Sequence, residues 1–292
     1  MGLNAAALGL MTLARASGAD FSRVVTIGRQ SLDLSSDDLQ RFFRKRGRAD
    51  LAQGLAAMPA DGYCEGLIQT AFGAQRVCSV DASDYEQAAI VHDMNTPLEP
   101  QETFSAVLDF GTLEHVFNLP VAFDNVARLA SEGAYILHML PGNNLVGHGF
   151  YQFSPELFFQ IYAPERGYEG TRVFAAPEGS PDVWYEVKSP RELGARVNLT
   201  SRDQMYLLVL TQKVREPVPL TQAPVQQSDY VQLWSKEPRR APTAKRRSKV
   251  ARVLRTALNG VRHRLKVARK DVAAASRTDV TVRRVLALTG EF

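Results

Sequence analysis

Short apolar runs rich in β-branched residues alternate with segments of helical periodicity over much of the chain. Five runs are candidate strands, and they span residues 23–27, 77–80, 89–92, 104–108 and 134–139. Alternating strands and helices are typical of a parallel sheet with helices on both faces. Later apolar runs at 183–187 and 205–210 indicate strands that close the same sheet. The pattern predicts an α/β fold with a doubly wound, mostly parallel, seven-stranded sheet.

Three of the predicted strands end on an aspartate, and the first ends on a glycine. Asp81, Asp93 and Asp109 follow the second, third and fourth strands, and Gly28 follows the first. A single aspartate in this position is usually a turn or cap residue. Ligands of open parallel sheets bind outside the carboxyl ends of the strands, so three carboxylates at this edge favour a polar ligand.

Turn and linker signals divide the chain into four parts. Residues 1–20 are apolar and alanine-rich, and without a positively charged start they fit a helix packed on the domain better than a signal peptide. Residues 21–215 form the α/β domain, with one helix over 113–129 and another that begins at Ser154-Pro155-Glu156. Residues 216–244 are a proline-rich linker, and residues 245–292 are a basic amphipathic C-terminal extension.

The residues Val24–Gly28, Asp81, Asp93 and the segment Asp109–His115 follow one another in a recognisable order. In this order the chain resembles the class I S-adenosylmethionine (SAM)-dependent methyltransferases. The stretch His138–Phe158 is also similar to bacterial methyltransferase-domain proteins, and the resemblance covers roughly residues 20–215. It implies a Rossmann-like fold, SAM as the cofactor and methyl transfer as the activity. By the same resemblance, the cofactor-binding residues would be Gly28, Asp81, Asp93, Met94 and Asp109.

The resemblance also implies which part of SAM these residues bind. Asp81 would accept hydrogen bonds from the ribose hydroxyls, for which a carboxylate offers two acceptor oxygens. Asp93 would bind the adenine amino group, with Met94 against the adenine ring. The alternative is that Asp81 and Asp93 are ordinary caps at the ends of strands.

Two features of the chain depart from that family. Gln30 and Leu32 stand where the family has glycines after Gly28, and their side chains would crowd a close approach of the backbone to the cofactor. An insertion at residues 33–61 separates Gly28 from Asp81, and it contains the basic amphipathic stretch 39–48. This stretch could form a lid, bind an anionic substrate, or be a solvated surface helix.

Candidate catalytic residues follow the fourth and fifth strands. Methyl transfer to a hydroxyl or to a protonated amine benefits from a base, and histidine suits this role because its pKa lies near neutral pH. His115 lies one helical turn after the fourth strand, and His148 lies in a loop with Gly149 and Phe150. Glycines beside aromatic residues favour a hinged cover over a substrate. His148, His115 and Asp109 are therefore the candidate catalytic residues, although either histidine could be structural.

A metal site is an alternative hypothesis for this part of the chain. The residues Asp109, Glu114, His115, His138 and His148 could meet at one edge of the sheet, and such mixed nitrogen and oxygen ligands suit zinc or iron. The chain has no compact HxH or HxxxH spacing. The sequence therefore predicts no metal site.

The net charge of +4 conceals a strong asymmetry. Residues 236–270 hold fourteen lysines and arginines against one acid, Glu237, and subtracting this +13 from +4 leaves about −9 for the rest. Apolar side chains at helical spacing within 245–270 predict a basic amphipathic helix. It suits an anionic membrane surface or an acidic protein partner. Docking on the acidic body comes second, and nucleic acid comes last because base-stacking aromatics are missing.

The remaining features favour a cytoplasmic protein. Cys64 and Cys78 fit buried thiols in a reducing compartment, and no apolar run reaches the roughly 20 residues that a membrane span needs. The leading hypothesis is a cytoplasmic bacterial SAM-dependent methyltransferase acting on a small molecule or a sugar-containing precursor, with peripheral attachment to the inner face of a membrane left open. The alternatives are a non-catalytic methyltransferase-like scaffold that binds a protein partner or a membrane surface, and a nucleic-acid-modifying enzyme.

Overall fold

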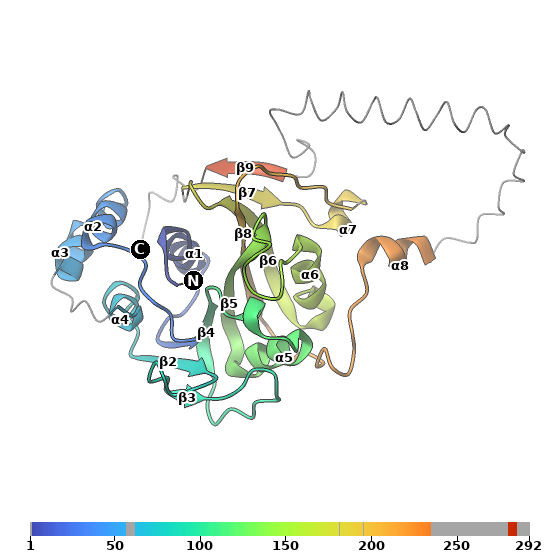
Figure 1. Cartoon of the computed structure of the whole chain (residues 1–292), viewed down its shortest axis with the longest axis horizontal. Coiled ribbons are helices and arrows are strands. Elements are labelled where there is room, and N and C mark those ends of the chain that lie inside the picture. The colour runs from blue at the N-terminus through green and yellow to red at the C-terminus, as the bar shows by residue number, and fades with distance from the viewer. Residues whose placement is uncertain (1, 57–61, 181, 195, 235–279, 285–292) are drawn as a thin grey trace, which may run out of the picture.

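Nine strands form one sheet in the part of the chain that the computed structural model describes, which is residues 2–56, 62–180, 182–194, 196–234 and 280–284 (Figure 1). The strands are β1 (Arg23–Ile27), β2 (Arg76–Asp81), β3 (Ile90–Val91), β4 (Phe104–Asp109), β5 (Ala130–Asn143), β6 (Tyr168–Pro177), β7 (Val183–Val187), β8 (Met205–Lys213) and β9 (Val280–Arg284). Their order across the sheet is β3-β2-β1-β4-β5-β8-β6-β7-β9.

Strand direction confirms the predicted doubly wound, mostly parallel sheet. β1 pairs in parallel with β2 and β4, β2 with β3, and β4 with β5. β8 is antiparallel to β5 and to β6, and β7 is antiparallel to β6 and to β9. Seven of the nine strands thus run in one direction, and β7 and β8 oppose them.

Helices cover both faces of the sheet (Figure 1). One face carries α1 (Ala5–Ala16), α2 (Ser36–Arg44), α3 (Ala49–Ala56) and α4 (Glu65–Phe72), and the other carries α5 (Leu119–Leu129) and α6 (Pro155–Ile161). The shorter elements are η1 (Leu113–His115), η2 (Pro164–Arg166), α7 (Pro190–Leu193) and α8 (Ser228–Trp234). Val24 and Val25 of β1 are fully buried in the two separate cores. Strands buried on both faces read as continuous apolar runs, which is why β1 was predictable.

The apolar N-terminal residues form α1, which packs against the sheet. Asn4 caps the helix, because its side chain accepts hydrogen bonds from the amides of Ala6 and Ala7. Residues Ala6–Ala14 are buried, and a Cβ atom at Gly9 would lie 2.9 Å from the Trp184 ring. The alanines and the glycine therefore let α1 lie close to its neighbours.

The sheet has two strands more than predicted. β6 was not expected, because its first half carries the polar and flexible residues Glu169, Gly170, Thr171 and Arg172 rather than an apolar run. β9 comes from the predicted C-terminal extension, and it pairs with β7 from Val280 to Arg284. Residues at the end of the basic extension therefore join the sheet.

The predicted helix over 113–129 is wrong at its start. The chain forms the single turn η1, leaves helical geometry at Val116, and begins α5 at Leu119. Pro120 lies in the first turn of α5, where its missing amide costs nothing, whereas inside a continuous helix it would break a hydrogen bond. The break matters for the site, because η1 holds Glu114 and His115 beside the end of β4.

The insertion after Gly28 forms α2 and α3. Leu39, Phe42 and Phe43 of α2 are buried in the core, while Arg41 and Arg44 project to the surface. No helix within the described ranges is long and apolar enough to cross a membrane. The predicted basic helix of residues 245–270 lies outside the described residues, as does the part of the linker from 235 to 244.

Candidate functional site

The turn after β1 packs tightly against the segment after β4. Gly28 has a φ of +72°, and its amide donates to the carbonyl of Val80 over 2.7 Å. A Cβ atom at this position would lie 2.4 Å from Oγ1 of Thr112, which itself donates to the carbonyl of Ile27 over 2.7 Å. Only glycine combines this conformation with this contact. Gly28 therefore holds two strand ends together at the carboxyl edge of the sheet.

Gln30 fills the inside of the same turn. Its side chain is 2% exposed, and its amide nitrogen donates to the carbonyl of Ile27 over 2.6 Å and to Thr112 Oγ1 over 3.2 Å. Its Oε1 atom is buried and has no hydrogen-bond partner among the described residues. Leu32, in contrast, packs against the core on the α1 face, and its backbone forms a bridge with Leu3. Of the two predicted obstacles, Gln30 is the one in the turn.

Asp81 lies beside this turn at the end of β2. Its two oxygens accept hydrogen bonds from the backbone amides of Ala82, over 2.7 Å, and Arg29, over 3.3 Å. The guanidinium group of Arg29 bonds to Glu65 and stacks over the ring of Tyr63 at 3.8 Å. The half-buried carboxylate of Asp81 is thus fixed next to Gly28, where the sequence predicts the ribose of the cofactor.

Asp93 and Met94 contact other residues of the chain, and these contacts do not require a ligand. Oδ1 of the exposed Asp93 accepts from the backbone amide of Asn95 over 2.9 Å and from its side chain over 2.8 Å. These hydrogen bonds, the backbone one first, lower the pKa of Asp93. Met94 is buried in the core next to Asn125. Their binding of adenine stays a prediction.

A buried chain of hydrogen bonds joins Asp109, His138 and Tyr162. Asp109 Oδ2 lies 2.8 Å from His138 Nδ1, and His138 Nε2 lies 2.6 Å from the Tyr162 hydroxyl. The ionised carboxylate can only accept, so Nδ1 carries the hydrogen and donates to Oδ2; in the neutral imidazole, Nε2 then accepts from the tyrosine hydroxyl. Burial raises the pKa of Tyr162 well above its usual value. Asp109 Oδ1 also accepts from the amides of Thr112 and Leu113.

Asp109 is therefore enclosed by its own protein. Its side chain is fully buried, and its described contacts fasten η1 to β5 rather than reaching the surface. Its predicted role as a catalytic or cofactor-binding residue stays a prediction. The structure shows instead how it positions the turn that carries Glu114 and His115.

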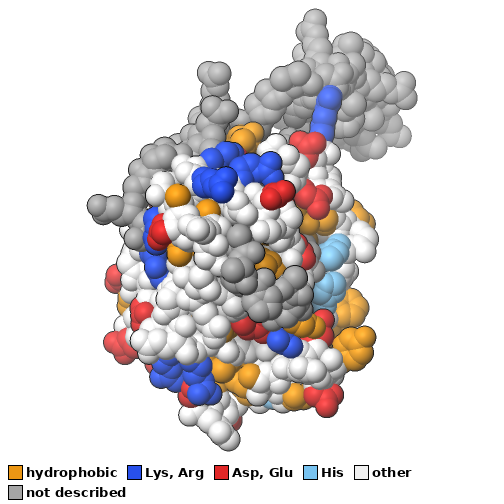
Figure 2. Space-filling view, turned by 90° about the vertical axis from the view of Figure 1, so that its left-hand side faces the viewer, with side chains coloured by type: hydrophobic (Ala, Val, Ile, Leu, Met, Phe, Trp, Pro, Cys, Tyr) orange, Lys and Arg blue, Asp and Glu red, His pale blue; other side chains and the backbone are white. Residues whose placement is uncertain are grey.

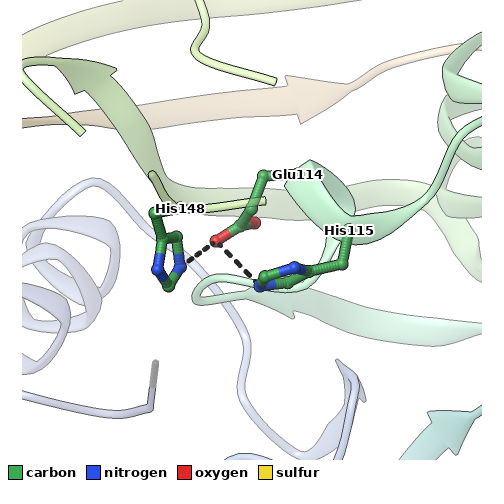
Figure 3. A group of neighbouring side chains, drawn as sticks. All are labelled: Glu114, His115 and His148. Carbon is green, nitrogen blue, oxygen red and sulfur yellow. Dashed lines mark ion pairs between the residues drawn. The ribbon is translucent and has the colours of Figure 1, made fainter. Parts of the chain in front are cut away.

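Glu114, His115 and His148 meet at the same edge of the sheet. Figure 3 shows the two imidazole rings on either side of the Glu114 carboxylate. Glu114 Oε1 lies 3.3 Å from His148 Nε2 and 3.8 Å from His115 Nε2. The Glu114 side chain is fully buried, whereas those of His115 and His148 are 49% and 34% exposed. The structure thus brings both predicted bases together over a carboxylate.

The loop that carries His148 is tied to η1. The Phe150 amide donates to the Glu114 carbonyl over 2.8 Å, and the His148 amide donates to the Leu145 carbonyl over 2.9 Å. Gly149 has a φ of +70°, and a Cβ atom there would lie 2.8 Å from the Glu114 carbonyl oxygen. Glycine at this position lets the loop approach η1. The sequence predicted a hinge here, and the contact shows a close approach of two segments.

Burial changes the titration of this cluster. Desolvation, with the nearby charge of Asp109 as the second cause, raises the pKa of Glu114 to about 8. Desolvation followed by the proximity of His148 lowers the pKa of His115. At neutral pH, the Glu114 carboxyl is therefore largely protonated and the His115 imidazole neutral.

Exposed apolar side chains stand close to the two histidines along the chain. Phe117 and Phe150 are exposed and meet edge to face with ring centres 5.9 Å apart, and Val146 is also exposed. The hydroxyl of Tyr151 bonds to the Phe117 carbonyl over 2.8 Å. Figure 2 shows histidine side chains beside hydrophobic ones at the right-hand edge of that face. Grouped exposed aromatic residues are typical of a surface that binds an apolar ligand.

The sequence does not predict three features of this site. Gln30 was expected to crowd the turn, but its hydrogen bonds to the turn were not foreseen. Tyr162 carries no local signal, because it reaches His138 only through the packing of the segment after α6. The spacing of Glu114, His115 and His148 along the chain gives no sign of their convergence, so the sequence predicts no metal site there.

The strand order decides the fold. The sheet reverses its winding between β1 and β4, and one antiparallel strand, β8, lies between β5 and β6. The chain therefore has a doubly wound, Rossmann-like α/β fold.

Comparisons with known proteins find solved structures of low sequence identity to this chain. No family model and no curated protein matches the chain. Among solved structures, YcgJ from Bacillus subtilis is 10% identical with a TM-score of 0.38, covering 71% of this chain and 99% of that one. TehB from Haemophilus influenzae is 12% identical with a TM-score of 0.39, covering 70% and 61%. Phosphoethanolamine N-methyltransferase 2 from Haemonchus contortus, solved with S-adenosyl-L-methionine, is 14% identical with a TM-score of 0.38, covering 72% and 52%.

Proposed function

We propose that the chain is a SAM-dependent methyltransferase that methylates a hydroxyl group of a small molecule or a sugar-containing acceptor. The observation that carries the proposal is the cluster of Glu114, His115 and His148 at the carboxyl edge of the sheet. This cluster follows β4 and β5. Gly28 follows the neighbouring β1, and Asp81 is the last residue of β2. The residues that could bind a nucleotide-type ligand and those that could accept a proton thus lie on the same carboxyl edge of the sheet.

The residues at the turn after β1 fit SAM in their chemistry. Asp81 offers carboxylate oxygens for the ribose hydroxyls, and the unpartnered Oε1 of Gln30 offers an acceptor for the ammonium group of the methionine part. When bound, SAM supplies an electrophilic methyl group on a positively charged sulfur. Gln30 would take the place of the backbone acceptors that a glycine-rich turn provides.

The chain's own residues can prepare the acceptor. The His115 imidazole is neutral at neutral pH, so it can take the proton of a hydroxyl as the bond between oxygen and methyl forms. Phe117 and Phe150 offer an apolar surface for the rest of the acceptor and exclude water from it. A hydroxyl acceptor suits this site because it must lose a proton during methylation.

A second candidate function is a non-catalytic methyltransferase-like scaffold. Gln30 favours it, because its buried side chain occupies the turn that the cofactor would approach. In that case the cluster and its apolar surround would bind a partner without methyl transfer. The two candidates differ in whether SAM binds.

Calorimetric titration with S-adenosylhomocysteine tests the proposal. We expect binding by the unaltered protein, and at least a tenfold loss in Asp81→Asn, because the charged acceptor of two hydroxyls is removed. Asp84→Asn is the control, since Asp84 is an exposed carboxylate in the same loop. Absence of heat at millimolar ligand in the unaltered protein would rule out the enzyme and leave the scaffold.

A further inference from the structure

We propose that Glu114, His115 and His148 bind a divalent transition-metal ion. Each residue offers one ligand atom, and these three atoms all lie within 4.8 Å of one another (Figure 3). The inference goes beyond methyl transfer, because a metal site does not follow from the fold.

Glu114 is the residue that most needs an explanation. Its side chain is fully buried, yet neither carboxyl oxygen has a hydrogen-bond partner in the described part of the chain. His148 Nε2 is also buried without such a partner within the same ranges. A buried polar group without a partner costs free energy, and groups of this kind in native proteins usually face an ion, a water or a ligand. One ion between the carboxylate and the imidazoles would give Glu114 and His148 the partner that each lacks.

The spacing of the ligand atoms suits a single ion. Ligands held about 2.1 Å from one ion lie about 3 to 3.5 Å apart in octahedral or tetrahedral geometry. The distances from Glu114 Oε1 to His148 Nε2 and to His115 Nε2 are 3.3 Å and 3.8 Å. Small rotations of the half-exposed His115 ring would therefore bring all three atoms into range.

The two segments that carry the ligands are already fixed to each other. The hydrogen bond from the Phe150 amide to the Glu114 carbonyl joins them, and Gly149 allows that approach. Asp109 holds the start of η1 through the amides of Thr112 and Leu113. A site with positioned ligands loses little conformational entropy when it binds an ion.

The ligand set indicates the kind of ion and leaves room for a substrate. Two imidazoles and one carboxylate suit Zn²⁺, Fe²⁺ or Mn²⁺ better than Mg²⁺, which prefers oxygen ligands. Three protein ligands leave at least one position open, and both histidines reach the surface. If the proposed function holds, that position takes the acceptor's oxygen. Because His115 would then be a ligand, the ion would replace it as the group that promotes loss of the hydroxyl proton. Coordination would lower the pKa of the hydroxyl, and the proton would leave to solvent.

Metal titration of the full chain, prepared without a histidine tag and dialysed against EDTA, tests the site. Binding of Zn²⁺ is followed by calorimetry, and Co²⁺ is followed by its visible absorption. We expect one ion per chain, and a loss of affinity of about 100-fold or more in His148→Asn, His115→Asn and Glu114→Gln, since even residues that only support a ligand contribute about 10- to 100-fold. Circular dichroism shows whether each variant folds. If Glu114→Gln does not fold, the two histidine variants are enough to test the site.

His92→Asn is the matched control, because His92 lies outside the cluster and its Nε2 contacts the Thr96 carbonyl instead. Stoichiometric binding that survives His148→Asn and His115→Asn would overturn the proposal, as would an absence of binding by the unaltered protein. The outcome is separate from that of S-adenosylhomocysteine titration. Metal binding without S-adenosylhomocysteine binding would contradict only the methyltransferase proposal. S-adenosylhomocysteine binding without metal binding would contradict only the metal site.

Discussion

The Oε1 atom of Glu114 lies 3.3 Å from the Nε2 atom of His148, although the two residues come from different segments of the chain. Their proximity depends on a backbone contact, because the loop after β5 reaches η1 through the Phe150 amide and past Gly149. The backbone thus fixes the cluster before any ligand arrives.

Gly149→Ala should separate the two segments. The new Cβ atom would meet the Glu114 carbonyl oxygen at 2.8 Å, and the φ of +70° disfavours alanine. We expect a loss of about 1–3 kcal/mol in the free energy of unfolding, together with weaker Zn²⁺ binding. Gly147→Ala is the control, since its Cβ atom would meet no atom within 4 Å. Urea denaturation and calorimetry measure both effects, and equal behaviour of the two variants would contradict the prediction.

Glu114 should make the metal-free protein less stable as the pH rises. Its pKa is about 8 in the folded protein against 4.5 as the ordinary value, so between these values the folded state holds more protons than the unfolded state. The free energy of unfolding therefore falls from about pH 5 to pH 8, by up to about 1.4 kcal/mol per pH unit. Glu114→Gln removes this contribution.

Urea denaturation in EDTA at several pH values measures the difference between the two proteins. The rest of the chain is the same in both proteins, so most of its pH-dependent contribution to stability cancels. We expect Glu114→Gln to gain stability relative to the unaltered protein as the pH rises, and the gain to level off above pH 8. A constant difference across the range would show that Glu114 does not carry a raised pKa.

Gln30→Ala distinguishes the two candidate functions. If Gln30 Oε1 binds the ammonium group of SAM, the variant should bind S-adenosylhomocysteine about tenfold more weakly, which corresponds to about 1.4 kcal/mol for one hydrogen bond. If the side chain blocks the turn instead, removing it should strengthen binding. Calorimetry measures the affinity, and Gln69→Ala, on the exposed face of α4, serves as the control.

Tyr162→Phe should weaken the fold without removing the metal site. The variant leaves His138 Nε2 buried without its partner, so we expect a loss of about 1–3 kcal/mol in the free energy of unfolding. Tyr168→Phe is a matched control, because Tyr168 is also buried but its hydroxyl makes no hydrogen bond to the described residues. Zn²⁺ affinity that falls 100-fold in Tyr162→Phe would show that the network forms part of the site.

The sequence predicts the centre of the sheet well and its far edge less well. β1 and β4 are buried on both faces, so their apolar runs carry a strong signal, whereas β6 begins with polar residues and β9 lies far along the chain. Strand ends were also predictable, which placed Gly28, Asp81 and Asp109 on one edge. The pairing of strands that are distant in sequence depends on tertiary packing, and local patterns do not report it.

The site was predictable as a set of residues and not as an arrangement. His115 and His148 are suggested by their residue type and their place after strands, and the structure brings them together. Which contacts they make depends on the break between η1 and α5 and on the loop conformation at Gly149. A sequence pattern shows the proline and the glycines but not the distances that result.

The pairing of β9 with β7 determines how the basic stretch of residues 245–270 can be removed. That stretch lies in the part of the chain, residues 235–279, that connects α8, which ends at Trp234, to β9, which begins at Val280. Truncation after residue 234 would also delete β9 and leave the backbone amides and carbonyls of β7 unpaired along an open edge, which invites pairing between molecules. Aggregation of such a truncated protein would then be mistaken for a role of the basic residues. An internal deletion that rejoins α8 to β9 through a flexible linker keeps that edge covered.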